Sequence, residues 1–347
     1  MNDKTTGCRA KPHRVQTMDD IARLSGVSKS TVSRVMNGST LVARETRRKV
    51  LAVMRRHAVS VNQAARRLRR KRANTVAVVI SLPSRPSELI QQPFMFDLLA
   101  GVFRALNSRR LHGLLVSPDH ETPETYEQMI ASRLVDGVIF LGQGERPDVL
   151  RDLATTELPF VTWGAPDDTA GYCTVGSDNP LGGELAGARF GKLGRRHILF
   201  VGRYGSAEIE LNRRREGLEQ GLRNVMTQFE VHEVQPSDWS FDACRTAFRD
   251  YIDSAAGVPD AIFCAGDRIA MAILSVLRAR NIAVPEQTTV IGYDDIPAAS
   301  LQTPAITTIR QDTRLAGTLL VDKLIQQING NIARSSVLPT QLLVRTS

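Results

Sequence analysis

Residues 27–35 read VSKSTVSRV and gather small hydroxyl side chains and two cations into one short stretch, without a histidine, cysteine or carboxylate. Hydroxyl groups and the N–H groups at a helix N-terminus suit phosphate oxygens. An arginine can make two hydrogen bonds to the edge of a guanine. These residue types therefore indicate contact with a nucleic acid rather than catalysis.

A helix-turn-helix arrangement is predicted around this stretch. Thr17 and Asp20 have the spacing of a capping box, which predicts the start of a first helix. Gly26 allows a tight turn, and Ser28 is placed to cap a second helix. A third helix is predicted at about residues 43–57. The positions expected to be buried are Ile21, Leu24, Val32, Val35, Val50, Val53 and Met54.

With its valines buried, the second helix turns its polar residues outward. Lys29, Ser30, Ser33 and Arg34 then lie toward the outer face and the N-terminal end. That end enters the major groove in helix-turn-helix proteins. Arg34 is the candidate base reader.

Charge divides the chain into a basic head and a mildly acidic remainder. Residues 1–73 contain 19 Lys/Arg and four Asp/Glu, a net charge of +15, while the whole chain carries +9. Residues 74–347 therefore carry the difference, −6. Such asymmetry favours a polyanion as the partner of the head.

The segment VNQAARRLRRKRAN, residues 61–74, extends the basic region. Residues 62–70 have the length of one short helix, with Ala65 and Leu68 on one face among four arginines. A cationic peptide of this length does not fold alone, but it can fold on DNA and insert an apolar side chain into the minor groove. A flexible basic linker is the alternative on these residues.

From Asn74 onward, buried strands alternate with helical segments. The predicted strands are TVAVVISL from Thr75, LLVS at 114–117, GVIFL at 137–141, FVTW at 160–163, ILFVG at 198–202, AIFCA at 261–265 and TVIGY at 289–293. This alternation predicts parallel sheets with helical crossovers. Its length favours two subdomains, with a ligand cleft at the carboxyl ends of the strands.

Several polar and aromatic residues follow these strands or lie near them. Arg214, Asp267, Asp294 and Trp239 are candidates to bind a polyhydroxylated small molecule, because carboxylates accept from paired hydroxyls and an indole covers an apolar sugar face. Each also has a plain structural reading. Asp267 can cap a helix, Asp295 can cap a turn, and Trp239 can belong to the core.

Other functional classes lack their signatures. The sequence has neither a phosphate-binding Gly-x-x-x-x-Gly-Lys loop nor a Gly-x-Ser-x-Gly elbow. It has no apolar run long enough to span a membrane and no apolar segment typical of a secretory signal. Cys8, Cys173, Cys244 and Cys264 are interpreted as free thiols. We therefore expect no enzyme activity, no metal and no cofactor.

The head resembles the lactose/galactose repressor (LacI/GalR) family. The resemblance rests on TMDDIARLSGVSKSTVSRVMNGSTLVARETRRKV followed by NQAARRL, and it covers the head without gaps. It implies that Lys29 and Ser30 choose the operator, that Arg34 is a constant reader, and that residues 62–70 form a hinge helix. The candidate DNA-binding residues are Thr17, Ser28, Lys29, Ser30, Thr31, Ser33, Arg34, Asn37, Asn62, Ala65 and Leu68.

Residues 74–345 resemble the effector domain of the same family, which is similar to periplasmic sugar-binding proteins. The candidate effector-binding residues are Phe94, Asp97, Trp163, Arg214, Trp239, Asp267, Asp294 and Gln311. Trp163 lies in PFVTWG, which is similar to the PFVTHG of the sugar-responding branch and favours a sugar over a purine. The sequence departs from the family at Gly266 and Gly164, where polar residues are usual.

The resemblance implies a homodimeric bacterial regulator in the cytoplasm, associated with the nucleoid when on its operator, most simply a repressor. The expected divisions are a basic extension at 1–16, a helix-turn-helix domain at 17–60, a hinge at 61–73 and an effector domain at 74–345. Within the last, one subdomain covers about 74–177 and 309–336, the other about 178–308 and 337–345. Whether an effector releases the protein from DNA or acts as a co-repressor stays open, and an architectural DNA-binding protein with a vestigial sugar-binding fold is the rival interpretation.

Overall fold

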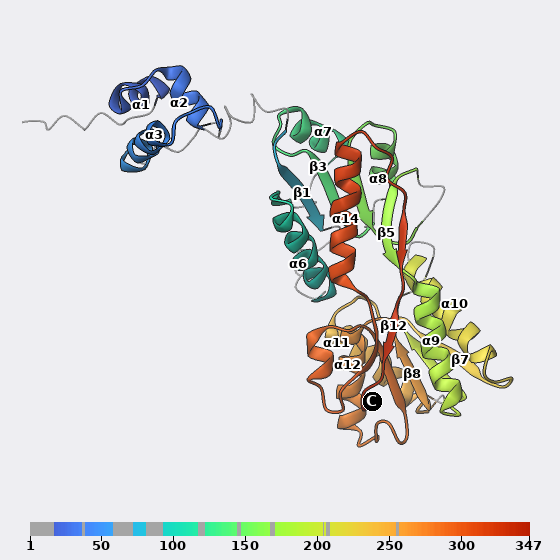
Figure 1. Cartoon of the computed structure of the whole chain (residues 1–347). Helices are drawn as coiled ribbons and strands as arrows, with labels where there is room; N and C mark the ends of the chain where they lie inside the picture. The colour runs from blue at the N-terminus through green and yellow to red at the C-terminus, as the bar shows by residue number, and fades with distance from the viewer. Residues whose placement is uncertain are drawn as a thin grey trace, which may run out of the picture. The chain divides into compact units, whose positions relative to one another are not determined.

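The computed structural model describes residues 17–36, 39–57, 72–80, 93–116, 122–143, 147–166, 171–203, 205, 209–254 and 257–347. Contacts between residues divide the chain into two units, Met1–Arg72 and Ala73–Ser347. Each unit is described by itself below (Figure 1).

The first unit is a small bundle of three helices, α1 (Met18–Ser25), α2 (Lys29–Met36) and α3 (Arg44–Arg56). The predicted capping box starts α1, and Gly26 ends it with a left-handed φ of 67°. The small core consists of Ile21, Ala22, Val32, Val35, Val50 and Met54. The three-helix head expected from the sequence is confirmed, although Leu24 is exposed rather than buried.

The second unit contains two six-stranded sheets, which we call the N sheet and the C sheet. The N sheet has the order β11-β5-β4-β3-β1-β2, and every pair in it is parallel. Its strands are β1 (Thr75–Ile80), β2 (His112–Val116), β3 (Gly137–Leu141), β4 (Phe160–Trp163), β5 (Cys173–Ser177) and β11 (Ser336–Leu338).

Helices cover both faces of the N sheet. Side chains of α6 (Pro93–Ser108) and α14 (Thr313–Ile328) join the core on one face, and those of α7 (Pro123–Ala131) and α8 (Pro147–Ala154) join it on the other. The sheet is therefore buried on both sides, which explains the continuous apolar runs of β1 and β3.

The C sheet has the order β12-β10-β9-β8-β6-β7. Its strands are β6 (His197–Val201), β7 (Glu230–Val234), β8 (Ala261–Cys264), β9 (Thr289–Asp294), β10 (Thr307–Arg310) and β12 (Gln341–Leu343). Only the β10–β12 pair is antiparallel. The accompanying helices are α9 (Asn179–Lys192), α10 (Ile209–Arg223), α11 (Phe241–Asp253), α12 (Asp267–Ala279) and the short α13 (Pro297–Ser300).

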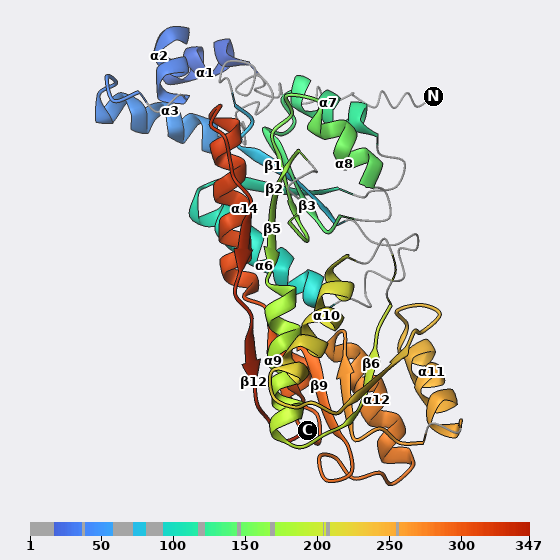
Figure 2. The ribbon, with the colours of Figure 1, turned by 90° about the vertical axis from the view of Figure 1, so that its right-hand side faces the viewer.

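The chain passes between the two sheets three times, from β5 to α9, from β10 to α14 and from β11 to β12 (Figure 2). The predicted α/β body with two parallel-sheet subdomains is confirmed. Among the described residues, no helix is long and apolar enough to span a membrane.

Helices α9 and α10 pack backbone against backbone, side by side in Figures 1 and 2. The contact is made through the glycines Gly183, Gly187, Gly217 and Gly221. A Cβ added at Gly183 would lie 2.0 Å from the carbonyl oxygen of Arg214 on α10. The close approach of these two helices therefore sets the position of Arg214.

Replacing Gly183 with alanine is expected to lower the free energy of unfolding by about 1–3 kcal/mol, the usual cost of an overpacked core. The added methyl group must push α10 away at Arg214, which outweighs the better helix propensity of alanine. Chemical denaturation measures the change. Lys192→Ala, at an exposed position on the same helix, is the control and should change stability by less than ~0.5 kcal/mol. A Gly183→Ala protein as stable as the wild type contradicts the close contact.

Candidate functional site

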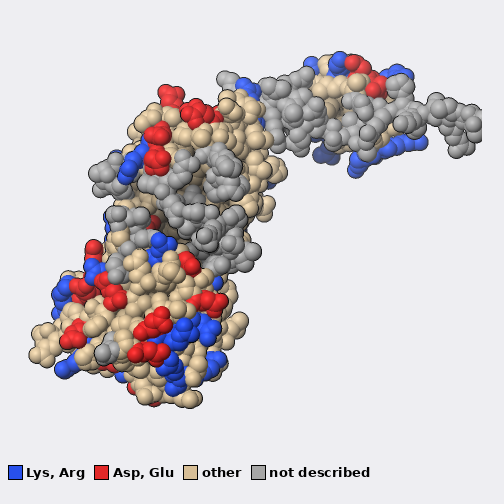
Figure 3. Space-filling model, turned by 180° about the vertical axis from the view of Figure 1, so that it is seen from behind, with Lys and Arg blue, Asp and Glu red and all other residues tan. Residues whose placement is uncertain are grey.

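Helix α2 carries an exposed polar face. The side chains of Ser28, Lys29, Ser30 and Arg34 are exposed, and those of Thr31 and Ser33 are half-buried. The Ser28 hydroxyl accepts from the backbone N–H of Thr31 at 3.2 Å and caps the helix. On the view in Figure 3, Lys and Arg side chains line one edge of the head, whereas both signs of charge interleave over the body.

Lys29 has a partner that the sequence did not predict. Its Nζ donates to Oδ2 of Asp19 on α1 at 2.8 Å, and the two side chains are 61% and 67% exposed. Exposed ion pairs contribute only about 0.2–1 kcal/mol, so the lysine can exchange this carboxylate for another anion.

The Thr17 side chain forms its hydrogen bonds within the head. Its hydroxyl donates to Oδ2 of Asp20 at 2.8 Å and accepts from the Asp20 backbone N–H at 3.2 Å. Its contribution supported by the structure is therefore to start α1. The predicted contacts Asn37, Asn62, Ala65 and Leu68, residues 61–71 of the hinge and the extension at 1–16 lie outside the described residues.

A second polar cluster lies at the carboxyl edge of the C sheet, around Arg214. Arg214 is 8% exposed. Its Nε donates to Oδ1 of Asn179 at 2.8 Å, and its Nη1 donates to the carbonyl of Ala265 at 2.6 Å. Its Cζ lies 3.6 Å from the centroid of the Tyr293 ring. These contacts fix the plane of the guanidinium, which suits a group that must orient a ligand.

Sequence reasoning missed two of these supports, Asn179 and Tyr293. Both have a local signal, because Asn179 opens the helix after β5 and Tyr293 directly precedes Asp294 in the strand. Tyr293 is fully buried, and burial raises its pKa to about 12. The ring therefore stays neutral and presents its face to the cation.

Asp294 ends β9 beside Arg214, and its Oδ1 accepts from Nε2 of Gln311 at 2.7 Å. Burial raises the pKa of Asp294 to about 6. This value already includes a smaller upward contribution from the charge of Asp97 and downward contributions from Arg214 and from the hydrogen bond of Gln311. The structure thus brings together Arg214, Asp294, Gln311 and Asp97, four of the predicted effector-binding residues.

Asp97 comes from the other subdomain. It is half-buried on α6, and burial raises its pKa as well. One turn earlier, Phe94 packs on Trp163 of β4 with ring centroids 5.9 Å apart. Both rings are buried, with exposures of 8% and 7%. They form a buried aromatic pair one helical turn from Asp97.

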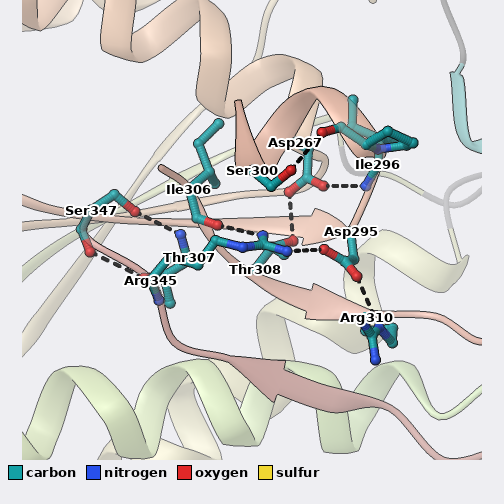
Figure 4. Close-up of polar contacts among 11 residues, drawn as sticks. Asp267, Asp295, Ile296, Ser300, Ile306, Thr307, Thr308, Arg310, Arg345 and Ser347 are labelled. Atoms are coloured by element: carbon teal, nitrogen blue, oxygen red, sulfur yellow. Dashed lines mark hydrogen bonds and ion pairs between the residues drawn. The ribbon is translucent and has the colours of Figure 1, made fainter. Parts of the chain in front are cut away.

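The remaining two predicted residues lie differently. Trp239 is half-buried against the core, and its carbonyl accepts from Arg268 Nη1 at 3.1 Å. Asp267 is fully buried, because the helix N-cap is Gly266 and the Asp267 side chain turns inward. It accepts from the backbone N–H of Ile296 and from the Thr308 hydroxyl (Figure 4). The structure therefore supports Asp267 as a support of the site rather than as one of its accessible groups.

The two glycine departures have local explanations. A Cβ on Gly164 would lie 2.6 Å from the side chain of Gln143, so Gln143 occupies the place of a side chain at 164. Gln143 is thus a polar candidate that the sequence did not reveal. A Cβ on Gly266 would lie 3.4 Å from Oδ2 of Asp294, so a longer side chain at 266 would lie against that carboxylate.

Two hydrogen bonds also join the end of β4 to α10. Glu210 accepts from the backbone N–H of Ala165 at 3.0 Å, and Arg213 donates to the carbonyl of Pro166 at 3.3 Å. No group of three or more His, Cys, Asp or Glu side chains in the described part of the chain is placed to hold a metal.

Comparisons with known proteins match the head and the body of this chain. Residues 17–62 match the family described as bacterial regulatory proteins, lacI family, and residues 188–347 match a periplasmic binding protein-like domain. The HTH-type transcriptional regulator CelR of Thermobifida fusca is 32% identical over 345 residues, which covers 96% of this chain and 98% of the relative. The ribose operon repressor of Haemophilus influenzae is 26% identical over 320 residues, covering 90% and 92%.

Solved structures give the same result. A complex of CelR with cellobiose superposes with a TM-score of 0.68 at 30% identity, covering 95% of this chain and 99% of that chain. The lac repressor bound to ONPG in its repressed state gives 0.78 at 25% identity, with the same coverage.

A helix-turn-helix head and a two-sheet binding domain with a charged cluster define a DNA-binding transcriptional regulator with a ligand-binding body. The chain belongs to the LacI family of bacterial regulatory proteins. Members of this family regulate transcription, and we therefore describe this protein as a transcriptional regulator and not as an enzyme.

The raised pKa of Asp294 predicts that the free energy of unfolding depends on pH. A raised pKa means that the folded protein binds this proton more tightly than the unfolded chain, so stability is lost as the pH rises from about 4 through about 6. Asp294→Asn keeps an acceptor for Gln311 but no longer ionises. We expect it to raise the free energy of unfolding at pH 8 by about 1–3 kcal/mol.

Chemical denaturation of wild type and Asp294→Asn between pH 4 and 8 measures this effect. The two curves should converge toward about pH 4, where the wild-type carboxyl is protonated. Gln311→Met, which removes the donor to the ionised carboxylate, should move the midpoint to higher pH. Parallel curves for wild type and Asp294→Asn contradict the raised pKa.

Proposed function

We propose that this regulator is a homodimeric repressor whose affinity for a pseudo-palindromic operator is controlled by a sugar. The observation that carries the proposal is the juxtaposition of the buried Arg214 with Asp294 and Gln311. Together these residues offer hydrogen-bond donors and acceptors in fixed positions. Asp97, from the other subdomain, is close enough for its charge to act on Asp294. Paired hydroxyls of a sugar match such a set, and an aromatic wall matches its C–H face.

The relatives support this chemistry. CelR has been solved with cellobiose, and other relatives are named ribose operon repressors. A carbohydrate therefore suits the cluster better than a purine, which offers fewer hydroxyl groups to two carboxylates. Trp163, which is buried, and Trp239, which is half-buried, are the two indoles that could cover the C–H face of the sugar.

On DNA, the two heads of a dimer occupy successive major grooves, and Leu68 of each hinge inserts into the central minor groove. We assign residues 17–60 to the head, 61–73 to the hinge and 74–345 to the body, with residues 1–16 as a basic extension. Sugar binding between the N-sheet and C-sheet subdomains changes their relation, and with it the ability of the hinges to order on DNA. We place the protein in the bacterial cytoplasm, on the nucleoid when bound.

The division of work within α2 can be tested by selecting preferred duplexes from a random DNA pool. Lys29→Ala and Ser30→Ala are expected to change the preferred sequence at one or two positions, by about tenfold in relative affinity for each lost base contact. Lys49→Ala, an exposed cation on α3 paired with Glu45, is the control and should weaken binding without changing preference. Unchanged preference in both α2 variants contradicts base reading.

The sugar response is tested by fluorescence anisotropy of the selected duplex with cellobiose, ribose and a wider sugar panel. At least one sugar should change operator affinity of the wild type. Asp294→Ala should lose this response and keep its operator affinity, because the carboxylate lies in the body and not in the head. A wild type that ignores every sugar, or an Asp294→Ala protein that responds normally, overturns the assignment.

A further inference from the structure

The loop that carries Asp294 has an unusual backbone. Asp294 has a φ of 108° and Asp295 a φ of 60°, so two successive non-glycine residues occupy positive φ. Each such residue costs of order 1–3 kcal/mol and persists only where its surroundings hold it. The groups that hold this loop therefore determine where the Asp294 carboxylate points.

Asp295 is held by two arginines from distant parts of the chain (Figure 4). Its Oδ2 accepts from Nε of Arg310 at 2.8 Å, and its Oδ1 accepts from Nη2 of Arg345. The Asp295 side chain is only 12% exposed and that of Arg345 20%, whereas Arg310 is 49% exposed. The Asp295–Arg345 pair is thus the shielded one, and little water competes with it.

Arg345 is itself anchored in the C sheet. Its Nη1 donates to the carbonyl of Ile306 at 2.7 Å, and its backbone N–H donates to Thr307 Oγ1 at 3.0 Å. Two residues later, Ser347 Oγ accepts from the Thr307 N–H at 2.8 Å and donates to the Val290 carbonyl at 2.6 Å. Arg345 and Ser347 are therefore hydrogen-bonded to residues of strands β9 and β10.

The residues on either side of Asp295, Asp294 and Ile296, have hydrogen-bond partners of their own. Gln311 binds the Asp294 carboxylate, and Asp267 accepts from the Ile296 N–H at 2.8 Å. Gly292 makes room for Asp267, because a Cβ there would lie 2.2 Å from its Oδ1. Each of the three loop residues thus has its own polar partners, and of the three only Asp295 is held by ion pairs with arginines, of which the one with Arg345 is the more shielded.

We propose that Asp295 and Arg345 are positioning residues of the effector site. The ion pair holds the left-handed turn, and the turn holds the Asp294 carboxylate toward Gln311 and Arg214. Neither residue needs to touch the effector. This inference rests on the proposed function, in which Asp294 binds a sugar.

The first test compares Asp295→Asn and Arg345→Gln with wild type, using the sugar that the wild type binds, with cellobiose as the first probe. Each variant should bind the sugar at least about tenfold more weakly by calorimetry. Affinity for the selected duplex without sugar should stay at the wild-type value. Arg345→Lys, which retains one cationic donor, should recover part of the loss.

A double-variant cycle separates positioning from general weakening. If Arg345 acts through Asp295, the protein with both substitutions should lose no more sugar affinity than either single variant. Additive losses overturn the inference, and so does wild-type sugar affinity in both single variants. Arg280→Gln, which breaks the exposed Arg280–Asp253 pair of the same subdomain, is the matched control and should bind sugar normally.

A second readout needs no sugar. The titration of Asp294, followed by carboxyl ¹³C NMR and assigned with Asp294→Asn, should have a midpoint near pH 6 in the wild type. Asp295→Asn, which is isosteric and so least disruptive to folding, should move this midpoint toward the ordinary value near 3.9 as the turn relaxes into solvent. An unchanged midpoint overturns the inference. A wild type that binds no sugar overturns the proposed function alone, since the NMR result still decides the role of Asp295.

Discussion

The buried guanidinium of Arg214 is the interaction on which the body depends most. A charge taken out of water is costly unless acceptors surround it, and here Asn179, the Ala265 carbonyl and the Tyr293 ring meet that need. These partners come from α9, the end of β8 and β9, so the three elements must keep their relative positions. The glycine contact between α9 and α10 delivers the arginine to this place. The acidic Asp294 then finds a cation beside it and retains a charge despite its burial.

Local patterns predicted the head and most of the buried strands, because helix caps, a turn glycine and apolar periodicity depend only on residues that are close together in the sequence. The missed strands are β5, β7, β10, β11 and β12, and three of them have weak local signals. β7 contains two glutamates and a histidine at an edge of the C sheet, and β11 and β12 have three residues each. These short strands form because a partner strand is already present. Pairing across the whole chain, and not propensity, creates them.

The candidate site followed the same rule. Arg214, Asp294 and Gln311 could be named from motifs, and the structure brings them together. Two features could not be predicted, since each depends on packing between segments far apart in sequence. The Asp267 side chain points inward, and Gln143 fills the space next to Gly164. Motifs in the sequence thus indicated the candidate binding groups better than the groups that position them.

The contact between Lys29 and Asp19 has a consequence for how the head searches DNA. Any phosphate or base that engages this lysine must first displace a carboxylate that belongs to the same molecule. Asp19 is therefore an internal competitor for polyanions. It removes up to ~1 kcal/mol from every encounter, and only a site that offers further contacts recovers the loss. Because the same cost applies to every site that Lys29 contacts, it shortens residence on random sequence as well as on the operator, and it helps a strongly basic head to leave unproductive sites.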